Sequence, residues 1–398
     1  MKILKAALYI FLVTAIAVSV SLKPAYADTI KIEYTDWLGL ILFEGDINGE
    51  TGWFLLDTGA DSSIVDIRFA ERIGLKKLKS PLSILGMGGI DEYAAKNVGI
   101  GEWYFEDVPI VGFDLSIVDR YLGFNLAAIL GADFLRKYAL TIDYQESYFT
   151  LSDESPDPGL NAHIIPFRIS DKLVFLKASP MNSDKEYTFL VDTGATSVVY
   201  FQNRLEEVYP EYKSWPRSLG WQEATFMGKK DADIFLMPEF SIGDAGIESL
   251  VTTVTQPGLL GIGLNLIGGS PVHGVVGWTF LRYWKVTFDY PNKRLILEPY
   301  EFYKEKWPHM FDSVGFMIAY ENGKPTIDHI LPDTPAADAD LQIGDVLLAI
   351  DGKDALKMDL LEISEMVMGE PGTDVVFLFE RDRKQFRLTL KRVHLFTE

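Results

Sequence analysis

An Asp-Thr-Gly-Ala motif occurs twice in the chain, at residues 57–60 and again at residues 192–195. Each copy ends an apolar run that has the character of a β-strand, Phe54–Leu56 in the first and Phe189–Val191 in the second. A strand that ends on an acid, a hydroxyl and a glycine places a carboxylate on a tight turn, where backbone groups can approach it closely. One such tripeptide is a weak signal, but two copies with matching lead-ins form a strong one.

Asp57 and Asp192, the acids of the two motifs, would do chemistry if the fold brought them together. Two carboxylates in a partly desolvated cleft cannot both ionise easily, because like charges repel strongly at low effective dielectric constant. Such a pair shares one proton and titrates as a unit. The ionised member can take a proton from water while the protonated member donates to a carbonyl oxygen. The sequence therefore predicts a catalytic pair that directs water onto an amide bond without a covalent intermediate.

The residues next to the two acids are suited to support them. Thr58 and Thr193 carry hydroxyls that can brace one turn against the other. Gly59 and Gly194 leave space for backbone N–H groups to reach the carboxylates. We therefore expect these four residues to hold the acid pair in place.

A glycine-rich segment follows each motif at a similar interval. The first contains Met87 and Gly88, and the second contains Met227 and Gly228. Glycine tolerates the backbone angles of tight hairpin turns. We expect these segments to be hairpin tips, or flaps, that close over a substrate and exclude water.

The similarity of the two halves extends well beyond the motif. Matching pairs of segments are Asn97–Gly101 with Glu239–Gly243, Leu122–Asn125 with Ile262–Asn265, Ile129–Leu135 with Val275–Leu281, and Ala139–Tyr144 with Lys285–Tyr290. A period of about 135 residues is too long for a solenoid repeat. The duplication therefore indicates two equivalent lobes.

The composition narrows the chemistry that the chain can perform. It has 398 residues, no cysteine, five histidines and a formal net charge of −20. Without cysteine there are no disulfides, no thiol catalysis and no cysteine-ligated metal. The negative charge argues against a nucleic-acid partner, which requires a basic patch. No two histidines have ligand spacing, so we expect no metal and no other cofactor.

Residues 1–27 have the pattern of a secretory signal. Lys2 and Lys5 form a positive start, Ala6–Val20 is apolar, and Ala25-Tyr26-Ala27 is a small-x-small cleavage site. We expect export to the periplasm or the medium after cleavage near Ala27. The alternative is an uncleaved segment that anchors the exported protein to a membrane.

The remaining chain is long enough for two or three domains. Lobe one is expected at residues 28–155 and lobe two at residues 160–300, separated by a connector rich in Pro, Asp and Ser. Short apolar segments alternate with turn residues in both lobes, which is typical of β structure. Short helices are expected at Ile67–Ile73, at Ala132–Lys137 and near Arg204–Val208. The segment Gly261-Ile262-Gly263 is expected to be a loop.

The third segment, residues 305–398, has no counterpart in the lobes. It contains Pro335-Ala336-Ala337, then Gly344-Asp345-Val346-Leu347, then a stretch with helical periodicity at Leu360–Met368. Over nearly its whole length it resembles a PDZ domain of bacterial envelope proteins. The resemblance implies an α+β domain that adds a peptide strand to a sheet edge. It also implies that backbone N–H groups hold the terminal carboxylate of the peptide, those of Val314, Gly315 and Phe316.

Residues 30–300 resemble the aspartic proteases of the retropepsin and pepsin group, in which each half contributes one Asp-Thr-Gly. The resemblance implies a mainly β fold, with a six-stranded type of lobe that is duplicated and a cleft between the lobes. It implies that Asp57 and Asp192 are the catalytic dyad. It also implies that a hydrophobic-hydrophobic-glycine segment packs behind each motif, which here places Leu130, Gly131, Val276 and Gly277. The flap segments do not match the family closely.

Two functions follow from these features. The first is an exported aspartic endopeptidase whose PDZ domain recruits peptide C-termini or protein partners. The second is a catalytically inactive scaffold whose protease-like lobes only hold extended chains. The two functions differ in what they require of the acids, because a scaffold has no reason to keep both Asp57 and Asp192. The intact pair therefore favours the peptidase.

Overall fold

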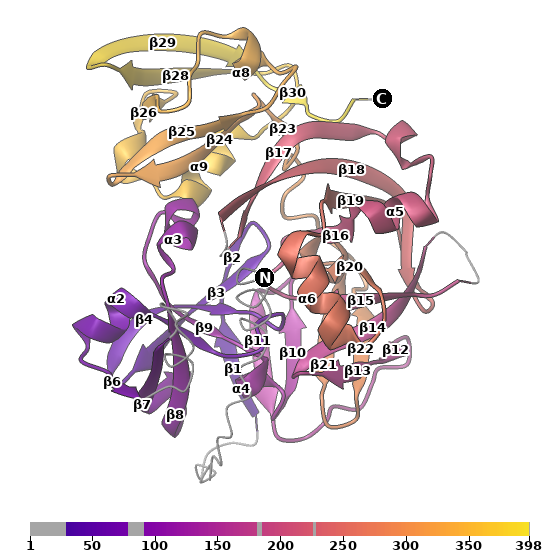
Figure 1. The fold of residues 1–398 in the computed structure, drawn as a ribbon. Helices are drawn as coiled ribbons and strands as arrows, with labels where there is room; N and C mark the ends of the chain where they lie inside the picture. The colour runs from indigo at the N-terminus through magenta and orange to yellow at the C-terminus, as the bar shows by residue number, and fades with distance from the viewer. Residues whose placement is uncertain (1–28, 79–90, 181–184, 226–227, 398) are drawn as a thin grey trace, which may run out of the picture.

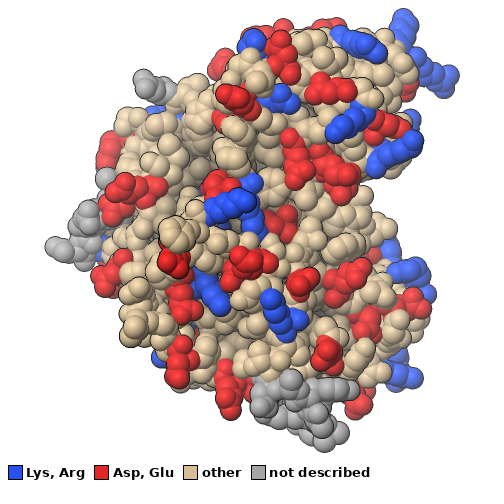
Figure 2. All heavy atoms as spheres, turned by 180° about the vertical axis from the view of Figure 1, so that it is seen from behind, with Lys and Arg blue, Asp and Glu red and all other residues tan. Residues whose placement is uncertain are grey.

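The computed structural model describes residues 29–78, 91–180, 185–225 and 228–397. Figure 1 shows two β-rich lobes side by side, with a third β-rich body lying above them. Figure 2 shows acidic and basic side chains interspersed over the opposite face of the molecule. No helix in the described part of the chain is long and apolar enough to cross a membrane.

Lobe one is built on a mixed sheet with the order β2-β3-β4-β9-β5-β8-β7-β6. Its strands are β2 (Thr35–Trp37), β3 (Leu40–Ile47), β4 (Glu50–Leu56), β5 (Ile64–Asp66), β6 (Lys76–Leu78), β7 (Asp91–Ile100), β8 (Trp103–Phe113) and β9 (Leu126–Leu130). The first motif follows β4, which pairs in parallel with β9 so that Leu56 lies opposite Leu130. Asn48 and Gly49, both with positive φ, make the turn between β3 and β4.

Lobe two repeats this topology strand for strand, in the order β13-β14-β15-β20-β16-β19-β18-β17. Its strands are β13 (Arg168–Ser170), β14 (Leu173–Pro180), β15 (Tyr187–Val191), β16 (Val198–Phe201), β17 (Arg217–Thr225), β18 (Gly228–Ile242), β19 (Ala245–Thr255) and β20 (Val272–Val276). The second motif follows β15, which pairs in parallel with β20. The predicted duplication is therefore present in the fold, although each lobe's sheet has eight strands in the described residues rather than six.

A six-stranded antiparallel sheet joins the lobes, in the order β1-β11-β10-β21-β22-β12. Its strands are β1 (Thr29–Glu33), β10 (Ala139–Asp143), β11 (Tyr148–Ser152), β12 (His163–Pro166), β21 (Trp284–Asp289) and β22 (Arg294–Pro299). The lobes meet where β10 pairs with β21, and there the hydroxyls of Thr141 and Thr287 lie 2.8 Å apart. Phe149 and Phe288 are fully buried in this sheet. Because the sheet takes strands from both lobes, it holds the two motifs in a fixed relation.

The helices of the two lobes are short. They are α2 (Ile67–Arg72), α3 (Ser116–Leu122), α4 (Ala132–Leu135), α5 (Gln202–Val208), the 3-10 turn η2 (Tyr212–Ser214), α6 (Gly258–Gly268) and α7 (Trp278–Leu281). The predicted helices correspond to α2, α4 and α5, with α4 ending two residues early. The prediction of a loop at Gly261–Gly263 is wrong, because that segment lies inside α6. Its glycines lower helix propensity, yet the buried Leu264 packs this helix onto lobe two.

The third body is an α+β unit with the sheet order β24-β25-β26-β28-β29. Its elements are β23 (Asp312–Ser313), β24 (Phe316–Glu321), β25 (Lys324–Ile330), α8 (Pro335–Asp338), β26 (Val346–Ile350), β27 (Lys353–Asp354), the 3-10 turn η3 (Ala355–Lys357), α9 (Leu360–Val367), β28 (Asp374–Arg381), β29 (Lys384–Lys391) and β30 (Val393–His394). The predicted helix at Leu360–Met368 is α9. Asp359 and Glu362 form a capping box at its start.

Candidate active site

The two lobes bring Asp57 and Asp192 together. Each acid lies one residue beyond its strand, at the same place in the two copies. A Cβ atom added to Gly59 would lie 2.2 Å from Cγ of Asp192, and one added to Gly194 would lie 2.7 Å from Cγ of Asp57. Each glycine therefore packs against the acid of the other lobe, at a distance that leaves no room for a side chain. The carboxyl groups are close enough to share a hydrogen bond.

Thr58 and Thr193 brace the two motifs against each other. The backbone N–H of Thr58 donates to Oγ1 of Thr193 at 3.0 Å, and the N–H of Thr193 donates to Oγ1 of Thr58 at 3.0 Å. Each hydroxyl then donates across the interface, from Thr58 to the Val191 carbonyl at 3.3 Å and from Thr193 to the Leu56 carbonyl at 2.9 Å. The four bonds are buried and related by the duplication. They place one acid opposite the other, as the sequence predicts for these hydroxyls.

Backbone N–H groups hold the carboxylates within each motif. Gly59 and Ala60 donate to Oδ1 of Asp57 at 2.8 and 2.9 Å. Gly194 donates to Oδ1 of Asp192 at 2.7 Å. One oxygen of each carboxyl is thus fixed by its own turn. The N–H of Gly59 also donates to the Asp192 carboxyl, so this glycine contacts both acids.

The segments predicted to pack behind the acids lie behind them. The Leu130 carbonyl accepts from the N–H of Asp57 at 3.1 Å, and the Val276 carbonyl accepts from the N–H of Asp192 at 3.0 Å. A Cβ atom on Gly131 would lie 2.7 Å from the Ser62 backbone, and one on Gly277 would lie 2.3 Å from the Ser197 carbonyl oxygen. Glycine is required at both positions because the turn that follows each motif passes directly over it.

Burial sets the protonation of the acid pair. Asp57 is 5% exposed, and Asp192 is half-buried. Desolvation raises the pKa of Asp57 well above its usual value, and the negative charge of Asp192 raises it further against the opposing N–H bonds of Gly59 and Ala60. Desolvation also raises the pKa of Asp192, while the hydrogen bond from Asp57 lowers it in part. The pair therefore holds one proton more firmly than isolated carboxyls do.

The raised pKa values predict that Asp57→Asn stabilises the fold at neutral pH. A buried carboxyl with a raised folded-state pKa stabilises the protein most in acid, and this contribution is lost as the pH rises through that pKa. We expect the wild-type free energy of unfolding to fall as the pH rises from the usual pKa of an aspartate to the raised pKa of Asp57. The free energy of unfolding of the variant should fall less over the same range, by roughly 1 kcal/mol or more. Denaturant unfolding at several pH values measures the difference. Parallel curves for the two proteins would contradict the assignment.

The structure places a third acid, Asp61, beside the first motif, and the sequence analysis did not single it out. Burial raises the pKa of Asp61 to about 6, while the nearby charge of Lys172 opposes this rise. Lys172 comes from the β13–β14 turn of lobe two, and its Nζ lies 3.3 Å from Oγ of Ser62. The two lobes therefore also meet beside the first motif. The available signal was an acid directly after the first Asp-Thr-Gly-Ala, where the second copy has Thr196.

The predicted flap residues Met87, Gly88 and Met227 lie outside the described residues. Gly228 begins β18, has a φ of 109° and pairs with Thr225. It therefore lies at the turn end of the β17–β18 hairpin, as expected for a hairpin tip.

The predicted carboxylate-binding segment of the third body precedes the edge strand β24. Val314 is fully buried, and Phe316 is the first residue of β24. Gly315 has a φ of 92°, and its N–H donates to Oγ of Ser313 at 3.2 Å. A Cβ atom there would lie 2.2 Å from Oγ1 of Thr334, so this turn requires glycine. A peptide carboxylate at this turn would have to share or replace the Ser313 contact.

Comparison with known proteins finds two families in the chain. Residues 43–134 match the model of the aspartyl protease family, and residues 326–381 match the model of the PDZ domain. No curated protein matches the chain. The first match spans most of lobe one and includes the first motif and the Leu130-Gly131 segment that packs behind it.

Among solved structures, the photosystem II D1 C-terminal processing protease is 25% identical, with a TM-score of 0.20, over 21% of this chain and 23% of its own length. The PDZ domain of a carboxy-terminal protease from Vibrio cholerae, in complex with a peptide, is 21% identical, with a TM-score of 0.20, over 21% of this chain and 94% of that one. An aspartic proteinase from Irpex lacteus is 14% identical, with a TM-score of 0.42, over 69% of this chain and 98% of that one.

The fold and the family models together define the class of this chain. It is a mainly β protein with duplicated lobes of the aspartic-protease type, followed by an α+β PDZ domain. It contains an aspartyl protease domain and a PDZ domain in one chain.

Proposed function

We propose that the protein is an aspartic endopeptidase in which Asp57 and Asp192 activate a water molecule. The observation that carries this proposal is the close pair of acids, Asp57 buried and Asp192 half-buried, held by a brace that is the same from both lobes. A scaffold that only binds chains gains nothing from two desolvated carboxyls that raise each other's cost of ionisation. The match of lobe one to the aspartyl protease family supports the same function.

The two acids take different roles in the reaction. One acid holds the shared proton while the other is ionised, and with the proton on Asp57 the base is Asp192. Asp192 takes a proton from water as the water oxygen bonds to the peptide carbonyl carbon. Asp57 gives its proton to the carbonyl oxygen, so that the tetrahedral intermediate is neutral. When the C–N bond breaks, Asp192 gives its proton to the amide nitrogen and Asp57 takes a proton from one hydroxyl of the intermediate, so that an amine and a carboxylic acid leave and the pair again holds one proton.

The PDZ domain would supply the protein with peptide C-termini or partner proteins. PDZ domains bind by adding a peptide strand to a sheet edge, and β24, which directly follows the Gly315 turn, is one of the two edge strands of this sheet. We further propose that residues 1–27 direct export, on the strength of their charge, apolar run and cleavage pattern. An exported peptidase without disulfides would depend on packing alone, which the shared six-stranded sheet supplies.

The experiment that tests this function incubates the full-length protein with an unfolded protein substrate at several pH values and identifies the cut sites by mass spectrometry. The same substrate in its folded form is the control, because the cleft that the aspartic-protease resemblance implies would accept an extended chain. We expect cleavage of the unfolded form at defined sites. Absence of cleavage at every pH, together with binding of peptide C-termini, would overturn the proposal and favour the scaffold.

A further inference from the structure

The PDZ domain packs directly on helix α3 of lobe one. Figure 1 shows α3 beneath α9 and β24, at the boundary between the two bodies. A Cβ atom on Gly123, which caps α3, would lie 3.0 Å from Cε2 of Tyr320 in β24 and 3.5 Å from the backbone nitrogen of Leu360 in α9. The end of α3 is thus inserted between the edge strand and the helix of the PDZ domain.

This contact is apolar and continuous with both cores. Leu115 and Leu122 are buried in the same hydrophobic cluster as Leu360 and Phe316, and the half-buried Val118 and Phe124 pack against it. Burial of this kind stabilises an interface in proportion to the apolar area removed from water. Helix α3 is therefore held on the PDZ domain mainly by apolar packing.

Asp328 in β25 connects the PDZ domain to both lobes at once. Its side chain is 7% exposed and lies 2.6 Å from Nζ of Lys229, which belongs to the β17–β18 hairpin of lobe two. It accepts a hydrogen bond from the Tyr121 hydroxyl at 3.1 Å and lies 3.5 Å from Arg120, both in α3. A buried carboxylate with partners from two lobes holds those lobes against it, because removing it would take the ion-pair partner from Lys229, whereas Arg120 also pairs with Glu321 at 2.6 Å.

The β17–β18 hairpin has further contacts with the PDZ domain. The Gly220 carbonyl contacts Nε2 of His329, and a Cβ atom on Gly220 would lie 2.7 Å from Pro332. Arg217 and Thr397 exchange two backbone hydrogen bonds of 2.9 Å. The hairpin therefore contacts the PDZ domain through β17 and through the start of β18.

We propose that the PDZ domain is an intramolecular clasp, meaning that its contacts around Asp328 hold α3 of lobe one and the β17–β18 hairpin of lobe two. In this arrangement α3 blocks part of the peptide-binding edge of the PDZ domain. A peptide that runs antiparallel along β24 from a carboxylate at Gly315 advances about 3.3 Å per residue. About its fifth residue from the C-terminus would reach Tyr320, where Gly123 and α3 lie. Peptides longer than this must displace α3, whereas shorter ones end before it. The proposal extends the recruiting role of the PDZ domain, and its test does not need the protein to be active.

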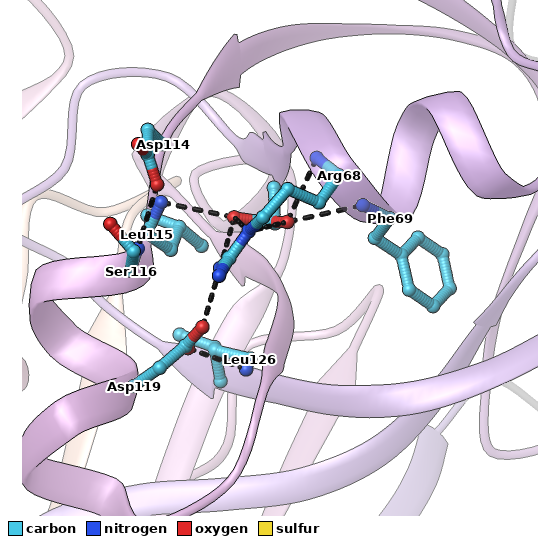
Figure 3. A network of polar contacts seen from close by, with 8 residues as sticks. Arg68, Phe69, Asp114, Leu115, Ser116, Asp119 and Leu126 are labelled. Carbon is cyan, nitrogen blue, oxygen red and sulfur yellow. Dashed lines mark hydrogen bonds and ion pairs between the residues drawn. The ribbon is translucent and has the colours of Figure 1, made fainter. Parts of the chain in front are cut away.

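Displacing α3 would also disturb β9, the strand that packs behind Asp57. Figure 3 shows Asp119 of α3 accepting a hydrogen bond from the N–H of Leu126, the first residue of β9, at 2.8 Å. Asp119 also pairs with Arg68, which is held by the α2 N-cap Asp66. At its other end β9 supplies the Leu130 carbonyl that accepts from Asp57. Strand β9 therefore contacts α3 at one end and the acid pair at the other.

The test uses the full-length chain carrying Asp57→Asn, so that peptides are not consumed. Twenty labelled ten-residue peptides, each ending in a different amino acid with a free carboxylate, are titrated by fluorescence anisotropy. The same peptides trimmed to their last four residues are titrated in parallel. The variants are Asp328→Asn, which removes the central charge of the clasp, and Asp374→Asn, which removes an exposed ion pair with Lys391 inside the PDZ domain.

We expect the best ten-residue peptide to bind the Asp328→Asn protein at least tenfold more tightly than the parent or the Asp374→Asn control. The four-residue peptides are expected to bind all three proteins alike. Equal affinity of the long peptides for all three would overturn the proposal, as would no binding by Asp328→Asn. Arg120→Gln removes one arm of the clasp from the lobe side and should act in the same direction, which covers the case that Asp328→Asn fails to fold. Backbone hydrogen exchange over residues 116–122 and 217–225 should rise in both variants.

Discussion

Asp57→Asn and Asp192→Asn are each expected to lower kcat/KM on the order of 10³-fold, because each variant lacks one half of a general acid–base pair. Asparagine keeps the size of the side chain and can accept the N–H bonds of the motif through its amide oxygen. It cannot take a proton from water or hold the shared proton. The measurement is the rate of cleavage of an unfolded protein, with cut sites identified by mass spectrometry.

The control for these variants is their stability. Both are expected to unfold at or above the wild-type temperature at neutral pH, because the substitution removes a buried carboxyl whose ionisation is unfavourable. Loss of activity with retained stability would then place the defect in the chemistry. Wild-type activity in either variant would mean that its acid takes no part in the reaction.

Thr193→Val is expected to cause the largest loss of stability for a single small change in the site. Thr193 is 1% exposed, and its hydroxyl accepts from the Thr58 N–H and donates to the Leu56 carbonyl. Valine leaves this donor and this acceptor buried without partners, at a cost of about 1–3 kcal/mol each. We expect a total loss of roughly 2–4 kcal/mol and a fall in Tm of roughly 3–7 °C.

Thr193→Ser is the matched control for this prediction, because it keeps the hydroxyl and loses only a methyl group. Its loss is expected to be about 1 kcal/mol. Thermal unfolding of both variants distinguishes the hydroxyl from the packing. Equal Tm values for the valine and serine variants would show that the brace contributes no stability.

The acid pair was predictable from the sequence because its signal is local and repeated. An apolar strand, an acid, a hydroxyl and a glycine specify a strand followed by a tight turn, and the second copy implies a second, equivalent turn. Gly131 and Gly277 followed from the resemblance, and the structure gives the physical reason in the turns that pass over them.

The helices α3 and α6 were not predictable in the same way. Glycine makes up four of the positions in α6, and local propensity therefore favours a loop, but packing on lobe two overrides it. In α3 the available signal was Gly123, which caps the helix in the left-handed conformation.

The contacts of the PDZ domain with the lobes lie beyond sequence reasoning of this kind. Arg120, Lys229 and Asp328 are far apart along the chain, and each has the pattern of an ordinary surface charge. Only the fold brings them together and shows that the Asp328 carboxylate is buried between them. For the same reason Asp61 gains significance only when the β13–β14 turn of lobe two brings Lys172 beside it.

The measurement that tests the central claim most directly is the dependence of kcat/KM on pH for cleavage of an unfolded protein. If Asp57 and Asp192 share one proton, the rate requires the singly protonated pair. Burial raises the pKa of the pair, so the rate should be high in mild acid and should fall as the pH rises through the upper apparent pKa. It should also fall in strong acid, where the base is protonated. A rate that stays constant from acid to alkaline pH would contradict the shared-proton mechanism.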